Sequence, residues 1–245
     1  MIHAKSVAPY LLLFTLSQLH ADTAGGEISL GFFNHQPNGH ASYKGNTANI
    51  EDTLGFSEEQ DIFIKAYLEH PLPLIPNIKL GYTELSHGGN SSVNDLTWGD
   101  TTYNDAIESS LSLDMTDVTL YYEFLDNWAE TDAGVTLRYI SGDMGVHSSG
   151  SSDVADFSAW VPMLYGKVRF ALPATDLSFQ LEANAVSYWD ITAYDYELSA
   201  RYTLAMGLGL EAGYKAFHIN SDELVNGFDA DMDFSGPYAA AIWDF

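Results

Sequence analysis

The sequence predicts an all-β fold, a transmembrane antiparallel up-and-down β-barrel of about ten strands. The first observation is that four segments between residues 158 and 218 alternate apolar and polar residues with a period of two, as strands with one apolar face do. The second is that the opposite face carries charges of both signs, which is typical of a polar lumen inside an apolar wall. The third is an excess of aromatic residues, with 15 Tyr, 13 Phe and 5 Trp, of the kind that forms girdles at membrane interfaces.

The composition indicates a single domain and excludes several classes of protein. The 245 residues include no Cys, which excludes disulfides and thiolate metal sites. The formal net charge of -25 would repel phosphate groups, which excludes a nucleic-acid partner. We expect no cofactor.

Residues 1–21 are predicted to be a signal peptide. Lys5 supplies a weak positive segment, an apolar run follows at residues 8–16, and Ala21 ends a small-residue cleavage site. The apolar run is too short to span a membrane as a helix. We therefore expect residues 22–245 to be exported and to form a barrel in a bacterial outer membrane, in contact with its lipid and lipopolysaccharide.

The first three strands are predicted from apolar residues at alternate positions. They centre on Leu30, Ile64 and Leu80, which we expect to face lipid. Polar segments that contain glycine, at residues 35–60 and 86–105, are predicted to be long loops.

The fourth strand changes its pattern part-way. Apolar residues occupy odd positions up to Met115 and even positions from Val118 onward, so a one-residue shift is predicted near residues 114–117. A β-bulge or a tight turn would produce this shift. We prefer the bulge, because a turn would give an odd strand count and move the next long loop to the short-turn end.

The remaining strands bring the predicted total to ten, with an eight-stranded barrel as the alternative. The two termini then meet at the short-turn end and close the sheet, so no edge faces lipid. The intervening turns are predicted at residues 125–131, 172–176 and 206–207, and a short loop at residues 189–193. The remaining long loops are predicted at residues 141–156 and 220–233.

Of the nine Lys and Arg residues, seven fall on the lumen face by strand parity. A basic residue facing the middle of the bilayer would cost about 2–4 kcal/mol, so this segregation supports the assignment of faces. Acidic residues share the lumen face, which predicts ion pairs between neighbouring strands. The predicted network consists of Lys65, Lys79, Glu123, Arg138, Lys167, Arg169, Glu182, Glu197, Arg201, Glu211 and Lys215. The pairs expected within it are Lys167 or Arg169 with Glu182, Glu197 with Arg201, and Glu211 with Lys215.

A lumen of this kind has two interpretations. Paired charges could fill a narrow barrel as a structural plug, or they could line a selective pore. Barrels of about eight strands are filled by their own side chains and open channels need about sixteen, which favours the plug. We therefore expect a non-enzymatic outer-membrane protein with a structural, surface-contact or small-solute role, and a narrow ion or solute pore is one alternative.

No catalytic residue is predicted. His35, His40, His87 and His147 occur in segments that also contain Ser or Asp, so a lipid-modifying enzyme with a site at the outer rim is the other alternative. The sequence contains neither a G-x-S-x-G nor an H-E-x-x-H motif.

Three aspartates at residues 229, 231 and 233 alternate like the start of a calcium loop. The Gly and the closing Glu at calcium-loop spacing are missing, so no metal site is predicted. Occasional bridging of lipopolysaccharide phosphates by divalent cations is the functional alternative.

Two segments resemble known outer-membrane proteins. The last eight residues, YAAAIWDF, contain Tyr238, Trp243 and Phe245 and resemble the C-terminal assembly signal of bacterial outer-membrane barrels. Residues 117–127, DVTLYYEFLDN, resemble a segment of a small proteobacterial outer-membrane β-barrel family whose members lack an assigned activity. The resemblance implies a location, a fold and the barrel assembly machinery as a partner of the C-terminal strand, but no chemistry.

Overall fold

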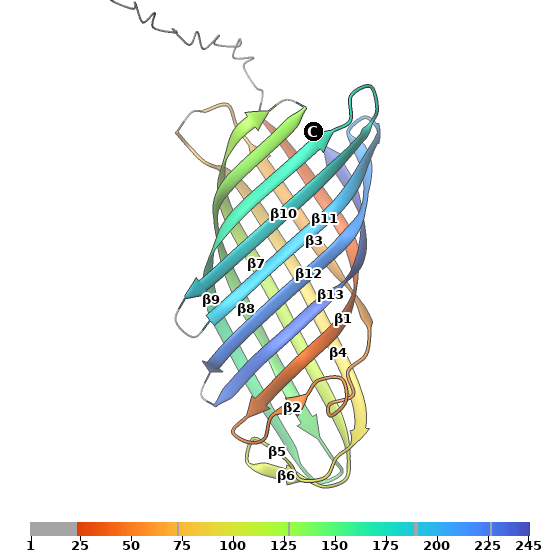
Figure 1. Cartoon of the computed structure of the whole chain (residues 1–245), viewed down its shortest axis with the longest axis vertical. Helices are drawn as coiled ribbons and strands as arrows, with labels where there is room; N and C mark the ends of the chain where they lie inside the picture. Colours follow the sequence, from red (N-terminus) through yellow and green to blue (C-terminus); the bar gives the residue numbers. More distant parts are fainter. Residues whose placement is uncertain (1–23, 73, 127, 189–190, 226) are drawn as a thin grey trace, which may run out of the picture.

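The computed structural model describes residues 24–72, 74–126, 128–188, 191–225 and 227–245 (Figure 1). The predicted signal peptide, residues 1–21, lies outside the described residues. Within them, no helix is long and apolar enough to cross a membrane. Ten long antiparallel strands close into a barrel, which confirms the predicted fold class and strand count.

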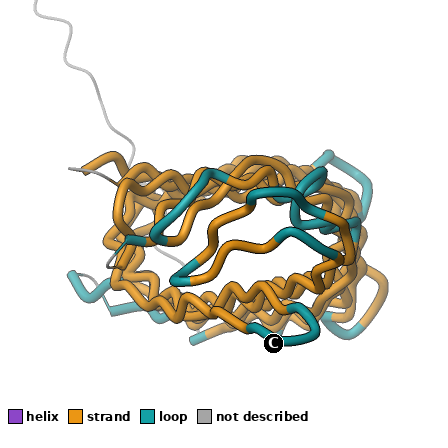
Figure 2. Tube along the Cα trace, turned by 90° about the horizontal axis from the view of Figure 1, so that it is seen from below, coloured by secondary structure: helices purple, strands orange, loops and turns teal. Residues whose placement is uncertain are grey.

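Each wall strand pairs with its neighbours along the chain, and β1 pairs with β13 to complete the ring. Figure 2 shows the closed wall in a view along the barrel. Three short strands, β2 (Ala48–Asn49), β5 (Leu96–Trp98) and β6 (Thr101–Tyr103), lie at the end opposite the C-terminus (Figure 1). The wall strands are β1 (Gly25–Tyr43), β3 (Glu59–Glu69), β4 (Asn77–Ser92), β7 (Ala106–Asp126), β8 (Ala129–His147), β9 (Ser152–Ala171), β10 (Leu177–Tyr188), β11 (Ile191–Ala205), β12 (Leu208–Val225) and β13 (Phe228–Asp244).

An apolar band bounded by aromatic residues surrounds the turn-end half of the barrel. On β9, exposed Leu164 lies between Phe170 at the turn end and Trp160 at the loop end, and the next outward residue, Ser158, is polar. Such a band is typical of the lipid-facing part of a transmembrane barrel, and short turns are typical of its periplasmic side. We call the part of the barrel beyond it the extracellular cylinder. We take as its boundary the last outward aromatic residue toward the loop end of each of six strands, namely Phe32, Tyr82, Tyr139, Trp160, Tyr194 and Tyr214, and call these residues the girdle.

The strands are longer than a membrane requires. A strand crosses a bilayer in about 9–11 residues, whereas β7 has 21 residues and β9 has 20. The predicted long loops are therefore wrong in extent, because large parts of them are wall strands of the cylinder, where polar residues face water. Three of the loops that connect wall strands at this end lie wholly within the described residues, and they cover residues 44–58, 93–105 and 148–151.

The predicted turns at residues 172–176 and 206–207 are confirmed. Met206 and Gly207 both have positive φ angles, 55° and 77°, as a two-residue type I′ hairpin turn requires. The predicted turn at residues 125–131 is shorter than expected, since β8 begins at Ala129. Part of the short loop predicted at residues 189–193 lies outside the described residues.

β7 is one strand, as predicted, but the predicted bulge near residues 114–117 is wrong. Its pairing with β4 runs from Ala106 to Tyr121 without a register shift, and over that range the odd-numbered residues point inward. Met115 packs inside the cylinder, whereas Val118 faces lipid. The apolar face of the strand thus changes from the inside to the outside at the membrane surface, while the backbone continues unchanged.

The position of the membrane can be tested on one strand. Leu164→Arg should lower the free energy of unfolding by about 2–4 kcal/mol, because it places a charge in the middle of the lipid-facing band. Ser158→Arg, on the same face of β9 but beyond Trp160, should cost at most about 1 kcal/mol. Denaturant titrations in phospholipid vesicles measure both values, and equal destabilisation would contradict this placement of the band.

Candidate functional site: a lumen filled in two layers

The side chains that fill the barrel form two layers. At the depth of the lipid-facing band the inward residues are mostly charged, and in the extracellular cylinder they are mostly apolar. An open pocket of about 450 Å³ at the periplasmic mouth reaches Glu27, Lys167 and Arg169 of the charged layer. Deeper in that layer the remaining cavity is only about 20 Å³, and Lys65, Asp117 and Glu182 are among its lining residues. That volume holds about one water molecule.

All seven basic residues that parity assigns to the lumen point into it. Six of them are buried, and Arg169 is partly exposed. Each lies within ion-pair distance of at least one carboxylate. The partners, however, are mostly different from those that the sequence suggests.

Glu197 on β11 is shared by two lysines. Lys65 Nζ lies 2.5 Å from its Oε2, and Lys215 Nζ lies 3.0 Å from its Oε1. Lys215 comes from the adjacent strand β12, but Lys65 comes from β3, four strands away around the wall. The prediction that Glu197 pairs with Arg201 is wrong. Arg201 instead pairs with Glu211, with Nε and Oε2 3.0 Å apart, which leaves Lys215 for Glu197.

Glu182 on β10 is the acceptor for a second group of donors. It forms an ion pair with Lys79 of β4. The hydroxyl groups of Tyr67 and Tyr165 donate hydrogen bonds to its Oε2, at 2.6 Å and 3.4 Å. All four side chains are buried. A buried carboxylate with several donors is stable in its ionised form only while those donors stay in place.

Lys167 and Arg169 of β9 pair nearer the periplasmic end of the lumen. The prediction that one of them pairs with Glu182 is wrong. Lys167 Nζ lies 2.5 Å from Glu130 Oε1 and 2.7 Å from Asp132 Oδ2, and Arg169 NH1 lies 3.1 Å from Glu130 Oε2. Both acids come from the preceding strand, β8.

Arg138 and Arg201 each bridge carboxylates from different strands. Arg138 makes two hydrogen bonds of 2.7 Å to Asp117, and its NH1 lies 2.7 Å from Asp195 Oδ2. Arg201 NH2 lies 2.6 Å from Glu27 Oε2. The predicted network leaves out Asp117 and Glu27. Asp117 lies where the bulge was predicted, and Glu27 lies at the edge of the first predicted strand.

The structure does not bring Glu123 into the ion-pair network. It lies at the periplasmic mouth with Glu130 and Asp132, and one carboxylate oxygen from each residue lies within 4.8 Å of the other two. Among the described residues, no Lys or Arg lies within ion-pair distance of Glu123.

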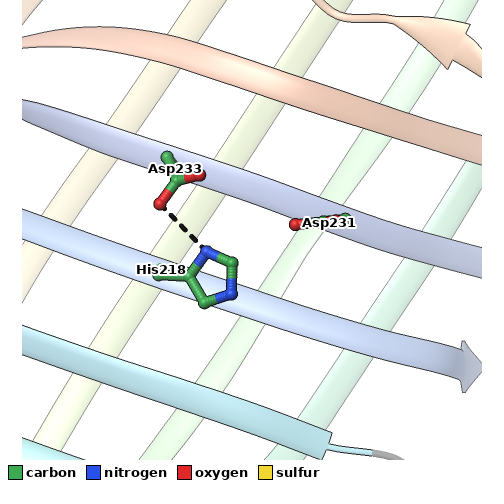
Figure 3. A group of neighbouring side chains, drawn as sticks. All are labelled: His218, Asp231 and Asp233. Atoms are coloured by element: carbon green, nitrogen blue, oxygen red, sulfur yellow. Dashed lines mark hydrogen bonds and ion pairs between the residues drawn. The ribbon is translucent and has the colours of Figure 1, made fainter.

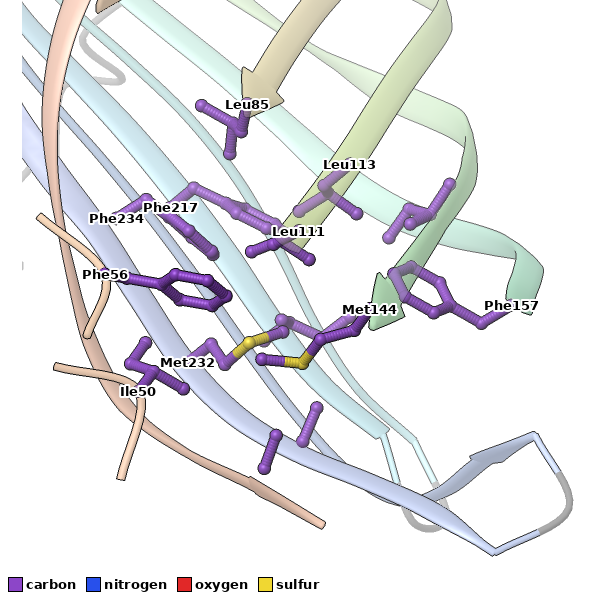
Figure 4. Packing of buried hydrophobic residues seen from close by; sticks show 14 of the residues in the cluster. Ile50, Phe56, Leu85, Leu111, Leu113, Met144, Phe157, Phe217, Met232 and Phe234 are labelled. Carbon is purple, nitrogen blue, oxygen red and sulfur yellow. The ribbon is translucent and has the colours of Figure 1, made fainter. Parts of the chain in front are cut away.

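The apolar layer fills the interior of the extracellular cylinder, on the loop side of the charged layer. Residues from the wall strands and from the segment between β1 and β3 meet in one cluster (Figure 4). Ile50 and Leu54 from that segment are fully buried, and Phe56 forms a bridge to Gly89 of β4. The segment therefore fills the space where the pairing of β3 with β4 has ended, since that pairing reaches only Phe63 and Thr83.

His35 and His87, which the sequence places in predicted loops, meet inside the cylinder. His35 Nδ1 lies 3.0 Å from His87 Nε2, and His35 Nε2 lies 3.1 Å from Asp61 Oδ2. His87 Nδ1 lies 2.9 Å from the carbonyl oxygen of Ser57, and its ring stacks on Phe234. Burial, with a smaller contribution from His87, lowers the pKa of His35 to about 4. At neutral pH this imidazole is therefore uncharged, as a site enclosed by apolar residues requires.

His40 and His147, the other two histidines considered for a rim site, lie apart from His35 and His87. His147 Nδ1 lies 2.7 Å from Ser152 Oγ at the tip of the β8–β9 hairpin. His40 lies on the outer face of the cylinder, with its Nε2 3.8 Å from Asp231 Oδ2.

The three residues of the predicted assembly signal do not share a face. Trp243 and Phe245 are exposed, and their rings lie 5.1 Å apart. Tyr238 points into the lumen, where its hydroxyl group donates a hydrogen bond to Glu211. Phe245 exchanges two backbone hydrogen bonds of 2.9 Å with Gly26, which continues the β1–β13 seam to the end of the chain.

No protein-family model and no curated protein sequence matches this chain. Among solved structures, the outer membrane protease OmpT from Escherichia coli superimposes with a TM-score of 0.51 at 12% identity, over 92% of this chain and 98% of that chain. The chain has an outer-membrane β-barrel fold. The attachment invasion locus protein Ail of Yersinia pestis gives a TM-score of 0.43 at 10% identity, over 90% of this chain and 99% of that chain. A major outer membrane protein from Thermus thermophilus gives 0.35 at 13% identity, over 91% and 100%.

The contribution of the charged layer can be measured at Glu182. Glu182→Gln should lower the free energy of unfolding by about 3–5 kcal/mol, because it leaves Lys79 as a buried charge without its carboxylate. The double variant Lys79→Met/Glu182→Gln should recover part of this loss, since no unpaired ammonium group remains. Asp156→Asn, on the exposed face of the cylinder, is the matched control and should change stability little. If Glu182→Gln is as stable as the control in denaturant titrations, the network does not stabilise the barrel.

Proposed function

We propose that this chain is a closed, non-enzymatic outer-membrane β-barrel protein with a structural and surface-contact role. The observation that carries the proposal is that side chains fill the interior in both layers. Paired charges fill it at membrane depth, and apolar side chains fill it in the extracellular cylinder. A continuous column of water would require the ion pairs to separate and the apolar cluster to open. Both steps are costly, because each leaves buried groups without partners.

The extracellular cylinder supports the surface-contact role. On β9 it extends eight residues beyond Trp160, to Ser152, a distance of about 26 Å along the strand at about 3.3 Å per residue. In the charged layer, seven basic side chains meet eight carboxylates, so most of the net charge of -25 lies elsewhere on the chain. The cylinder thus presents a rigid, acidic surface beyond the membrane.

The outer membrane is the proposed location, with lipid and lipopolysaccharide as surroundings. The barrel fold and the apolar band support this location, and the predicted signal peptide would provide export. The resemblance of residues 117–127 to a small proteobacterial family is consistent with it. Exposed Trp243 on the last strand and exposed Phe245 directly after it support recognition by the barrel assembly machinery, whereas Tyr238 faces away from such a partner.

A lipid-modifying enzyme is less well supported. Such a site needs a nucleophile, a base and an orienting acid close to the lipid. His147 and Ser152 are in contact, but they lie at the tip of the cylinder, far along β9 from the girdle residue Trp160. Among the described residues, no carboxylate lies within ion-pair distance of His147.

Conductance in planar bilayers tests the closed lumen. The unmodified protein should give current near the baseline, whereas a sixteen-stranded porin in the same bilayer should give large steady steps. Insertion of the protein is verified separately by protease protection and heat-modifiable migration. Steady, ion-selective steps from the inserted protein would overturn the closed lumen and favour the pore.

A further inference from the structure

Two histidines and two aspartates gather on the outer face of the extracellular cylinder, away from the lumen. His218 belongs to β12, Asp231 and Asp233 to β13, and His40 to β1. In the strand register His218 lies opposite Asp233, and His40 lies opposite Asp231. Three adjacent strands therefore present four metal-ligating side chains on one face, and Figure 3 shows the three that belong to β12 and β13.

The geometry of three of these side chains already approaches that of a metal site. His218 Nδ1 lies 2.9 Å from Asp233 Oδ1. One ligand atom from each of His218, Asp231 and Asp233 lies within 4.8 Å of the other two. Metal–ligand bonds of this class are about 2.0–2.2 Å long, so ligand atoms that surround one ion lie within about 4.4 Å of one another. His40 Nε2 lies 3.8 Å from Asp231 Oδ2 but outside this group of three, so the His40 side chain would have to rotate toward the ion to supply a fourth ligand.

The ring of His218 is held in place by its surroundings. It stacks on the ring of Tyr194 from β11, with centroids 4.7 Å apart and an interplanar angle of 24°. The side chain of His218 is 15% exposed, whereas those of Asp231 and Asp233 are 37% and 49% exposed. One ligand is thus preorganised, while the two carboxylates remain open to an ion from solution.

The two aspartates lack a permanent positive partner. They are two residues apart on one strand face, and no Lys or Arg lies within ion-pair distance of either among the described residues. The seven basic side chains of the wall strands all point into the lumen. Among the described residues, the histidines are the only side chains near the two carboxylates that can carry a positive charge, so a bound cation would offset the repulsion between the carboxylates.

The chemistry of the ligands selects the class of cation. Calcium and magnesium take oxygen ligands, whereas imidazole nitrogen together with carboxylate oxygen suits zinc and its first-row neighbours. The aspartates alone predict no metal site, because the Gly and the closing Glu of a calcium loop are missing. The folded barrel, however, brings histidines from two other strands next to them. We propose that His218, Asp231 and Asp233, with His40 as fourth ligand, bind a divalent transition metal ion of the zinc class.

The proposal does not depend on the proposed function and can be tested on the full chain, purified without a histidine tag and refolded in detergent. Calorimetric titration with Zn²⁺ should show one site per chain. His218→Gln and Asp231→Asn should each weaken binding by at least about tenfold. His147→Gln, at the hairpin tip, is the control and should leave the affinity unchanged. Heat-modifiable migration shows that each variant is folded.

Co²⁺ provides a spectroscopic readout that reports the ligands of the bound ion. A variant that only destabilised the fold would not change this readout in the molecules that remain folded. Co²⁺ bound at the site should give a visible absorption spectrum with a nitrogen ligand, and this spectrum should be lost in folded His218→Gln. A large excess of Ca²⁺ should not displace the ion. Absence of Zn²⁺ binding, equal binding by folded His218→Gln, or ready displacement by Ca²⁺ would each overturn the proposal.

Discussion

The pairing of charges across the lumen is the constraint on which the rest of the barrel depends. A lipid-facing wall must carry its polar residues inside, and a ten-stranded ring is too narrow to surround them with bulk water. Each buried charge therefore needs a partner within the protein. Glu197 shows how this is achieved, because it accepts Lys215 from the adjacent strand and Lys65 from a strand across the ring. Such cross-lumen pairs connect strands that share no backbone hydrogen bonds, and they hold the cross-section of the barrel closed.

The two layers follow from what surrounds the wall at each depth. Within the membrane the exterior is apolar, so the interior receives the charges. In the extracellular cylinder the exterior is water, so the interior becomes an ordinary apolar core, to which residues 50–56 contribute. Met115 and Val118 mark the change on β7, since one packs inside and the other faces lipid. The uncharged His35–His87 pair lies on the apolar side of this boundary, where burial keeps the pKa of His35 low.

Strand parity within the band was sufficient to predict the fold class, the strand count and the inward direction of all seven basic residues. The parity argument failed at the membrane surface, where the surroundings of the wall change from lipid to water. There the apolar face of a strand changes from the outside to the inside, as it does on β7 without a bulge. For the same reason, residues 141–147 resemble a loop although they continue β8. The ion-pair partners could not be predicted from neighbouring strands, since a lysine such as Lys65 reaches across the lumen. The meeting of His218 with two aspartates likewise depends on a strand register that periodicity does not determine.

The central claim, that the lumen is closed and largely dry, is tested most directly at Ser199. This residue lies in the charged layer, is 4% exposed, and its hydroxyl group has no hydrogen-bond partner, so Ser199→Cys is a mild change. The chain has no native Cys, which gives a clean background. In proteoliposomes, a charged thiol reagent applied to both sides should leave Ser199→Cys unmodified while it labels Ser158→Cys on the outer face. Labelling of Ser199→Cys at a rate similar to that of Ser158→Cys would show an open aqueous lumen and contradict the account.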